Sequence, residues 1–341
     1  MLNIEDYRLF IAQHLKKSND SIKLQLITGD ASFRRYYRVT VSSDNYILMV
    51  SDPEIQDNAP FIELNSFFSS GGIKVPHILS FDKAKGYILI EDLGRIHLAD
   101  CLRKGDINVL YKEVIDVLPH IARLPAHQAM KPYDALFIDS ELEIFKTWLV
   151  EDFCLLSFDI GMTKTWQQVK GHLTNGLEMQ PKITMHRDYH SRNLMRFNDG
   201  WAVIDYQDAV QGPLCYDLVS LIKDCYHVLD IPTRDALLAY GFEQYQAAGL
   251  TQGLTFTDVK LLFTLTGIQR HLKAAGIFCR LSKRDNKHGY LVNVLPTINY
   301  IQQACEELSD SFPNLHYFSQ WITTCLLPVL RQKLSAEGVT L

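Results

Sequence analysis

The sequence has no long apolar run, no regular cysteine spacing and no excess of positive charge. No apolar run approaches the roughly 20 residues of a membrane-spanning helix, and the N-terminus is acidic where a signal peptide would be basic. The seven cysteines are scattered, odd in number and form no CxxC pair, which argues against a disulfide framework and against a structural zinc site. We therefore expect a cytoplasmic protein with reduced thiols and no membrane partner.

Nucleic acid is also excluded as an expected partner. The net charge is −5, which gives no general attraction to a polyanion, and no nucleic-acid-binding motif is present. No feature indicates a protein partner. Hydrophobic residues make up 47% and charged residues 21% of the chain, as in an ordinary folded protein. A length of 341 residues exceeds one ordinary core, so the sequence favours two lobes.

The pattern of apolar residues divides the chain into a strand-rich beginning and a helical remainder. The predicted early elements are strands over 23–27, 33–41, 46–50, 75–80 and 87–90, with a helix over 60–69. The predicted later helices are 107–124, 141–156, 216–228, 259–276 and 295–308, interrupted by a strand-and-loop segment over 183–208. This order predicts an α+β fold with a small β-rich N-terminal lobe, residues 1–92, and a larger helical C-terminal lobe, residues 93–341.

One short segment carries most of the predicted chemistry. His186-Arg187-Asp188 is followed by Asn193, and Asp205 comes directly after the apolar pair Val203-Ile204. Between them, Asn198-Asp199-Gly200 predicts a tight hairpin turn. Phosphoryl transfer from ATP needs an acceptor for the hydrogen of the attacking hydroxyl and oxygen ligands for Mg²⁺, and protein kinases use this same order of Asp, Asn and Asp. We predict that Asp188 orients and deprotonates a substrate hydroxyl and that Asn193 and Asp205 bind Mg²⁺, with His186 as a support for the loop.

A second candidate is the turn between the first two predicted strands. Gly29 and Ser32 belong to it, and Arg34 and Arg35 follow it. Backbone amides in such a turn bind phosphate readily, and the arginines would assist. With a single glycine the turn is neither a P-loop nor GxGxxG, so an ordinary hairpin with solvated arginines is an equal alternative.

Four separated segments resemble the aminoglycoside phosphotransferase-like branch of the kinase superfamily, and specifically the anomeric N-acetylmuramate/N-acetylglucosamine kinases of cell-wall recycling. They are Gly29-Asp30-Ala31-Ser32-Phe33-Arg34-Arg35-Tyr36-Tyr37-Arg38, Ile90-Glu91-Asp92-Leu93-Gly94, the 185–208 core, and Gln269-Arg270-His271-Leu272-Lys273 with Gly276-Ile277-Phe278-Cys279-Arg280-Leu281 and Arg284-Asp285. The resemblance implies a bilobal protein-kinase-like fold and ATP-dependent phosphorylation of the C1 hydroxyl of either amino sugar. It also implies a hinge at Glu91 and Leu93 whose backbone bonds the adenine.

The sequence allows more than one role for several residues in or near these segments. Met49 stands about where kinases carry a phosphate-binding lysine, and the resembling family shares this methionine, which makes Arg34 and Arg35 the candidates to replace the lysine. Asp208 would assist metal or substrate binding, or cap a loop. Arg270 and Arg280 would receive the lactyl carboxylate of N-acetylmuramate, or belong to a solvated basic helix face.

Two other functions stay open at this level. The first is a kinase of the same fold that acts on another alcohol, such as choline or an aminoglycoside, although cationic substrates would favour an acidic pocket over the basic segment after residue 269. The second is a nucleotide-binding pseudokinase. The missing lysine favours this second reading, whereas the intact set of Asp188, Asn193 and Asp205 opposes it.

Overall fold

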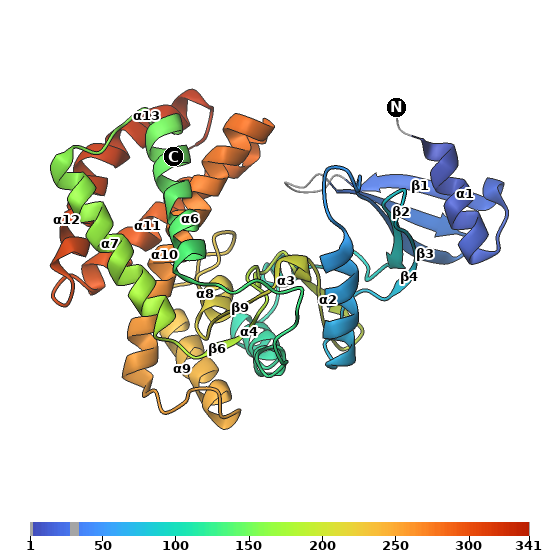
Figure 1. The fold of residues 1–341 in the computed structure, drawn as a ribbon, viewed down its shortest axis with the longest axis horizontal. Coiled ribbons are helices and arrows are strands. Elements are labelled where there is room, and N and C mark those ends of the chain that lie inside the picture. Colours follow the sequence, from blue (N-terminus) through green and yellow to red (C-terminus); the bar gives the residue numbers. More distant parts are fainter. Residues whose placement is uncertain (1–2, 28–33, 341) are drawn as a thin grey trace. The chain divides into compact units, whose positions relative to one another are not determined.

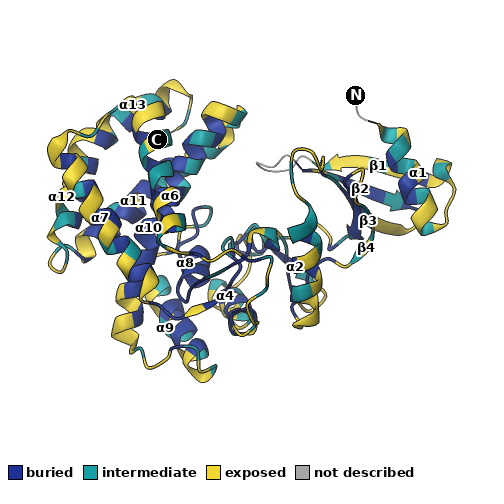
Figure 2. Ribbon diagram, in the orientation of Figure 1, coloured by how far each residue is buried: buried dark blue, intermediate teal, exposed yellow. Residues whose placement is uncertain are grey.

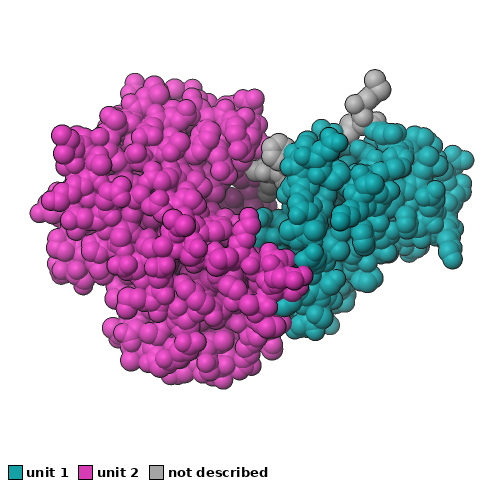
Figure 3. All heavy atoms as spheres, viewed as in Figure 1, with its two compact units in different colours: residues 1–98, 193–208 teal, residues 99–192, 209–341 magenta. Residues whose placement is uncertain are grey.

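The structure is a computed structural model that describes residues 3–27 and 34–340. The chain forms two compact units (Figure 3). Unit 1 contains residues 1–98 and 193–208, and unit 2 contains residues 99–192 and 209–341. The predicted α+β class is confirmed, with the sheet in unit 1 and most helices in unit 2 (Figure 1). The lobe boundary proposed between residues 92 and 93 stays a prediction.

Unit 1 is built on a five-stranded antiparallel sheet with strand order β1-β2-β3-β5-β4. The strands are β1 (Ile22–Ile27), β2 (Arg35–Val41), β3 (Asp44–Val50), β4 (Ile78–Asp82) and β5 (Tyr87–Glu91). The remaining elements are α1 (Ile4–Leu15), the 3₁₀ turn η1 (Asn19–Ser21), α2 (Ala59–Ser70), the hairpin β7 (Leu194–Phe197) and β8 (Gly200–Val203), and the 3₁₀ turn η3 (Tyr206–Asp208).

The alternation predicted for β2 explains how the sheet is covered. Tyr37, Val39 and Val41 are buried on one face and pack against Tyr7 and Phe10 of α1. Successive side chains of a strand point to opposite faces, so the residues between them form the second face. The side chain of Arg34, just before β2, is buried on this second face.

Helix α2 is fixed to η3 by a buried polar contact. The amide of Asn65 donates to the hydroxyl of Tyr206 at 2.6 Å and to the carbonyl of Pro76 at 2.8 Å. Phe61 and Phe68, on the same helix, pack against the Tyr206 ring with centroids 5.2 and 5.9 Å apart. These contacts set the position of the segment that follows β8.

Unit 2 is almost entirely helical. Its elements are α3 (Leu98–Cys101, which begins at the last residue of unit 1), α4 (Ile107–Ile115), α5 (Leu118–Ala122), α6 (Ala135–Ile144), the π-helix η2 (Phe145–Phe153), α7 (Ile160–Glu178), β6 (Lys182–Met185) paired with β9 (Val210–Pro213), α8 (Tyr216–Ile222), α9 (Ile231–Ala247), α10 (Phe256–Asp285), the 3₁₀ helix η4 (His288–Asn293), α11 (Val294–Glu307), α12 (Pro313–Trp321), the π-helix η5 (Ile322–Leu326) and α13 (Leu327–Ala336).

Helix α10 is the central element of unit 2. It begins at a capping box between Thr255 and Asp258 and ends at Asn286, which has a positive φ of 54°. It is dark blue over most of its length in Figure 2, whereas α7 and α12 show yellow faces. It packs against α11, α6, α7 and α8, so most of the core of this unit lies along it. None of the described helices is both long and apolar enough to cross a membrane.

Most predicted elements are present, and the differences in their boundaries have local causes. The helix predicted over 107–124 is split into α4 and α5, because Pro119 lacks an amide hydrogen and therefore favours the start of a new helix. The strand predicted over 75–80 begins only at Ile78, after Pro76. The helix predicted over 259–276 extends to Asp285, since its turn signals lie beyond that range. The Asn198-Asp199 turn between β7 and β8 is confirmed.

Gly276 marks the closest approach of α10 to its neighbour. A Cβ at this position would lie 2.5 Å from the carbonyl oxygen of Ile144 and 2.8 Å from the amide of Phe145. We predict that Gly276→Ala destabilises the protein by about 1–3 kcal/mol, because the added methyl group must push two backbones apart. Chemical denaturation would measure the change. Gly171→Ala is the matched control: it lies inside helix α7 with nothing within 4 Å of its Cβ, and should stabilise by about 0.5–1 kcal/mol. Equal effects of the two substitutions would contradict the packing argument.

Candidate active site

The loop that follows β6 carries His186, Arg187 and Asp188 and is held by one buried carboxylate. Asp217, in the first turn of α8, accepts hydrogen bonds from the amides of His186 at 2.6 Å and Arg187 at 2.8 Å. Burial raises the pKa of Asp217 to about 6, against the opposing effect of His186 and the two amides. Arg187 has a φ of +77°, which is uncommon for a residue with a long side chain. Backbone strain of this kind persists where the surroundings fix it, and often at functional sites.

Three further contacts fix the rest of the loop. The amide of Asp188 donates to Nδ1 of His186 at 3.3 Å, which agrees with the predicted supporting role of this histidine. The buried hydroxyl of Tyr189 donates to the carbonyl of Val114 at 2.8 Å. The amide of Ser191 donates to Asp224 at 3.0 Å. The loop is therefore anchored on both sides of Asp188.

Asp188 is half-buried in a positively charged environment. Burial alone would raise its pKa, but Lys273, Arg187, His190 and Arg270 outweigh burial and hold the pKa well below its ordinary value. The carboxylate therefore stays ionised at any pH near neutrality. An ionised carboxylate on a fixed loop is suited to accept a hydrogen bond from a substrate hydroxyl.

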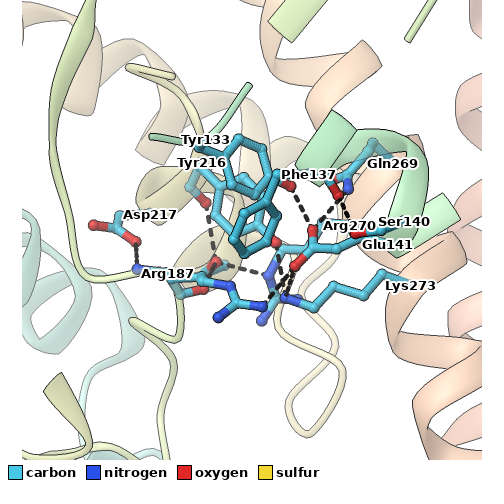
Figure 4. A network of polar contacts seen from close by, with 11 residues as sticks. Tyr133, Phe137, Ser140, Glu141, Arg187, Tyr216, Asp217, Gln269, Arg270 and Lys273 are labelled. Carbon is cyan, nitrogen blue, oxygen red and sulfur yellow. Dashed lines mark hydrogen bonds and ion pairs between the residues drawn. The ribbon is translucent and has the colours of Figure 1, made fainter. Parts of the chain in front are cut away.

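These cations are balanced by Glu141, which is almost completely buried (Figure 4). Its Oε1 contacts Arg187 at 2.7 Å and Lys273 at 2.9 Å. Its Oε2 accepts hydrogen bonds from the Tyr133 hydroxyl and from Gln269 at 3.0 Å. Four donors thus converge on one carboxylate. Burial by itself would raise the pKa of Glu141, but Lys273 and Arg187 lower it to about 2.

Unit 1 holds the other predicted chemical residues together. Nδ2 of Asn193 lies 3.4 Å from Oδ2 of Asp205, and Gln207 donates to Asp205 at 2.7 Å and to Asp208 at 3.2 Å. Asp205 has a positive φ of 66°, and both carboxylates are exposed. Carboxylate and amide oxygens are the ligands that Mg²⁺ prefers, so Asn193 and Asp205 fit the predicted metal site, with Asp208 two residues beyond Tyr206 within reach of the same amide.

Arg34 belongs to the same neighbourhood. Its side chain is only 7% exposed, and its guanidinium lies 5.7 Å from the Phe61 ring. Burial raises the pKa of Tyr36 to about 12, and both Arg34 and Asp205 act on that hydroxyl electrostatically, which places the three groups close together. Arg35 is exposed and faces Tyr7 on the other side of the sheet. Arg34 is therefore better placed than Arg35 to act near Asp205.

The third-strand position predicted to lack a lysine is an ordinary core position. Met49 is fully buried and pairs with Tyr36 across the β2–β3 ladder. Glu63, the usual partner of the absent lysine, is exposed on α2. Residues directly opposite each other in a ladder share a face, so Tyr36 and Met49 lie on the face toward which Arg34 also points. A cation from the start of β2 thus lies on the same face as the methionine.

The predicted hinge is held by an ion pair. Arg38 makes a bidentate contact with Asp92, at 2.6 Å from Nε and 3.0 Å from Nη2, and donates to the carbonyl of Gly94 at 2.7 Å. Gly94 has a φ of 96°, which favours glycine. A bidentate arginine–carboxylate contact fixes geometry as well as charge. The backbone of the hinge is therefore fixed from β2.

The two hinge residues named from the sequence have different environments. The Glu91 carboxylate is already used within unit 1, because it accepts from Lys74 at 2.6 Å and from the amide of His77 at 3.1 Å. Leu93 is buried against Met195 and Ala202 of the β7–β8 hairpin. The Glu91 amide is used as well, because it donates to the carbonyl of His77 at 2.8 Å. The backbone contacts of this hinge with a ligand stay a prediction.

The structure brings some predicted residues together and leaves others apart. In unit 1 it groups Arg34, Asn193, Asp205 and Asp208, and in unit 2 it groups Asp188 with Arg270. Arg270 is buried and donates to Ser220 at 2.7 Å, so its role near Asp188 is at least partly structural. Arg280 lies further along α10. Gly29 and Ser32 lie outside the described residues.

Sequence reasoning missed Glu141 and Arg38 as members of the site. Glu141 looks like any helical glutamate, because its partner Arg187 is 46 positions away. Arg38 is 54 positions from Asp92. The only signal was indirect: an unusually basic segment around residue 270 requires a buried acid somewhere in the fold.

The sequence matches the family described as "Phosphotransferase enzyme family" over residues 23–254, well over half of the chain. It therefore belongs to this family, whose enzymes transfer phosphate to an alcohol. More specifically, it belongs with relatives named N-acetylmuramate/N-acetylglucosamine kinase. The relative from Pseudomonas putida is 34% identical over 82% of this chain and 83% of its own length. The relative from Neisseria meningitidis is 31% identical over 85% of this chain and 88% of its own.

Solved structures agree on the fold. An ethanolamine kinase from Plasmodium vivax has a TM-score of 0.63 at 13% identity, covering 92% of this chain and 85% of its own. A choline kinase from Cryptosporidium parvum has a TM-score of 0.62 at 13% identity, covering 94% of this chain and all of its own. The kinase-like fold predicted from the sequence is confirmed. At such low identity the likeness concerns the fold alone.

We predict that Glu141→Gln destabilises the protein by about 3–5 kcal/mol, because it leaves two buried cations without their counter-charge. The new amide would also have to face two hydrogen-bond donors. The carboxylate stabilises the folded state fully above its ordinary pKa of 4.5, and this contribution is lost as the pH falls toward about 2. The free energy of unfolding of Glu141→Gln should therefore fall less between pH 4.5 and about 2 than that of the unchanged protein.

Glu143→Gln is the matched control for this prediction. Glu143 lies on the same helix and pairs with Lys170 at 2.7 Å, but its side chain is 36% exposed. Solvent screens such a pair, so the cost should not exceed about 1 kcal/mol. Similar losses in the two variants would show that the Glu141 cluster does not carry the stability assigned to it.

Proposed function

We propose that this enzyme uses ATP and Mg²⁺ to phosphorylate the anomeric C1 hydroxyl of N-acetylmuramate, N-acetylglucosamine or both. The observation that carries the chemistry is the ionised carboxylate of Asp188 on a doubly anchored loop. The names of the relatives support the choice of sugar. The product would be the sugar 1-phosphate, made in the cytoplasm, where ATP is available, during recycling of cell-wall sugars.

Asp188 would accept the hydrogen of the attacking hydroxyl and direct the oxygen toward the phosphorus. Its low pKa makes it a weak base but a good hydrogen-bond acceptor. Phosphoryl transfer passes through a loose transition state that needs more positioning than proton abstraction, so an orienting carboxylate is sufficient. The proton would leave the hydroxyl late, as the bond to phosphorus forms.

Asn193 and Asp205 would hold Mg²⁺, and Asp208 is the candidate for an assisting ligand or a substrate contact. When bound, the ion would neutralise charge on the phosphate oxygens. Two of the carboxylates that would hold it already lie together in unit 1, because Gln207 donates to both Asp205 and Asp208. The strained backbone of Asp205 supports a functional role for this position.

The nucleotide would be bound by unit 1. The backbone of Glu91 and Leu93 would pair with the adenine. Arg38 holds this hinge in place through Asp92, which supports the assignment. Arg34 would take the place of the missing lysine beside the phosphates, and its low exposure on the Met49 face supports this assignment. Gly29, Ser32 and Arg35 remain candidates for phosphate contacts.

Arg280 is the candidate that would contact the lactyl carboxylate of N-acetylmuramate. Arg270, Lys273 and Arg280 recur at helical spacing on one stripe of α10. Arg280 is therefore about 10 Å beyond Lys273 along the axis, comparable with the length of a substituted sugar. Its Nε is buried and has no hydrogen-bond partner among the described residues. The side chain as a whole is half-buried, and a guanidinium with such a donor is suited to bind a carboxylate.

We predict that Asp188→Asn lowers kcat by about 10²–10⁴-fold while ATP affinity changes little. The assay is ADP release with N-acetylglucosamine, N-acetylmuramate, choline and an aminoglycoside, with phosphorus NMR of the product. The control is Asp230→Asn, since Asp230 only caps α9 and asparagine caps equally well. Near-normal turnover of Asp188→Asn would remove Asp188 from the mechanism. Turnover of choline or the aminoglycoside alone would retain the kinase and refute the choice of sugar.

A second prediction separates the two sugars. Arg280→Met should raise KM for N-acetylmuramate about tenfold or more, because a charge-assisted hydrogen bond is lost, and should leave N-acetylglucosamine within about twofold. Lys283→Met removes the same charge from an exposed position of the same helix and serves as the control. If both sugars respond equally to Arg280→Met, Arg280 does not read the carboxylate.

A further inference from the structure

A pocket of about 530 Å³ opens in unit 2 among α9, α10 and α11. Its lining shares no residue with the candidate active site. Apolar side chains form part of its walls, and of these Leu238, Phe263 and Tyr300 are buried; the rest of the lining is polar or charged. Small-molecule sites typically combine walls of this kind with a few polar groups that orient the ligand. The polar groups of this pocket therefore decide what it would bind.

The most buried charged group among them is Lys223, the residue that ends α8. It is only 8% exposed, and Nζ lies 4.8 Å from the centroid of the Phe263 ring. Among the residues that the structure describes, this ammonium has no hydrogen-bond or ion-pair partner. Buried charges are normally paired, because removal from water is costly. Burial accordingly lowers the pKa of Lys223 to about 8, against the opposing effect of Glu307.

A glycine in α10 leaves space for this ammonium. A Cβ at Gly267 would lie 3.2 Å from Nζ of Lys223. Glycine inside a helix costs roughly 0.8–1 kcal/mol relative to alanine, and here it lies in the middle of a 30-residue helix. The lysine thus has no paired anion within the described part of the protein, and the glycine beside it leaves room for its ammonium. A ligand that pairs with the lysine would account for both.

The other charges are arranged with anions outside and the buried cation inside. Asp235 is exposed and lies 4.0 Å from Lys260. Glu306 and Glu307, which also line the pocket, are exposed as well. Arg234 is half-buried, with its guanidinium 5.2 Å from the Tyr300 ring. A ligand would therefore insert its negative end toward Lys223 and place its apolar part against Phe263.

We propose that this pocket is a second binding site, for a small ligand with a carboxylate or phosphate group on an apolar or aromatic body. Lys223 binds the anionic group, Arg234 flanks it, and Phe263 and Leu238 contact the body. This proposal does not depend on the kinase reaction or on the identity of the sugar substrate.

Fluorine NMR titration of the full chain tests the proposal with 4-fluorobenzoate and 4-fluorophenyl phosphate as probes. Neutral 4-fluorobenzyl alcohol is the matched probe. At least one anion should bind, and Lys223→Met should weaken its binding about tenfold or more, since methionine keeps the apolar stem without the charge. Neutral 4-fluorobenzyl alcohol should have the same affinity for the unchanged protein and for Lys223→Met. Equal affinity of the anion for both proteins, or no binding of either anion up to about 10 mM, would overturn the proposal.

Two further variants make the result specific to the pocket. Arg234→Met should weaken the same anion without disturbing the core, whereas Lys182→Met, which removes an exposed lysine outside the pocket, should leave its affinity unchanged. Thermal unfolding gives an independent readout. Because Lys223 is unpaired, Lys223→Met should keep or raise Tm without ligand. A lower Tm would mean that the ammonium is already satisfied within the protein, and the proposal would fail.

Discussion

The charge balance around Glu141 is the constraint on which the rest of unit 2 depends. Glu141 comes from α6, Lys273 and Gln269 from α10, and Arg187 from the catalytic loop, so one carboxylate ties three elements together. Around it lie three cations, Arg187, Arg270 and Lys273, and two carboxylates, Glu141 and Asp188. Arg187 and Lys273 therefore act on both carboxylates, and the cations beside the loop suit a site where phosphate oxygens must be brought to a hydroxyl.

Three buried or half-buried carboxylates of this region differ because their partners differ. Asp188 and Glu141 face cations, and their pKa values fall. Asp217 is bonded mainly by neutral amides, and burial raises its pKa to about 6. The cations keep Asp188 ionised, as its proposed role requires, whereas Asp217 at the start of α8 fixes the loop by accepting from the amides of His186 and Arg187. Neither effect is visible from the residue type, because all three are ordinary acidic residues in the sequence.

The sequence predicted what depends on local pattern. The alternation of apolar residues predicted the buried face of β2. The spacing of Asp188, Asn193 and Asp205 indicated phosphoryl transfer. It did not predict what depends on pairs far apart in the chain. Glu141 is 128 positions from Gln269, and no periodicity links them. The predicted helix boundaries were wrong where a single proline outweighed an apolar pattern, as at Pro119.

The substitution of methionine for the usual lysine illustrates how a fold keeps a charge while moving it. Met49 completes the core between its neighbours on β2 and β5, where it pairs with Tyr36 and Ile88. A lysine there would need a carboxylate from α2, and Glu63 is exposed. Arg34 instead enters the same face from the start of β2, beside Tyr36 and close to Asp205. Its planar guanidinium lies near the Phe61 ring, and such a contact with an aromatic face favours a cation. The absence of the lysine is therefore compatible with catalysis, and the position of Arg34 weakens the case for a pseudokinase.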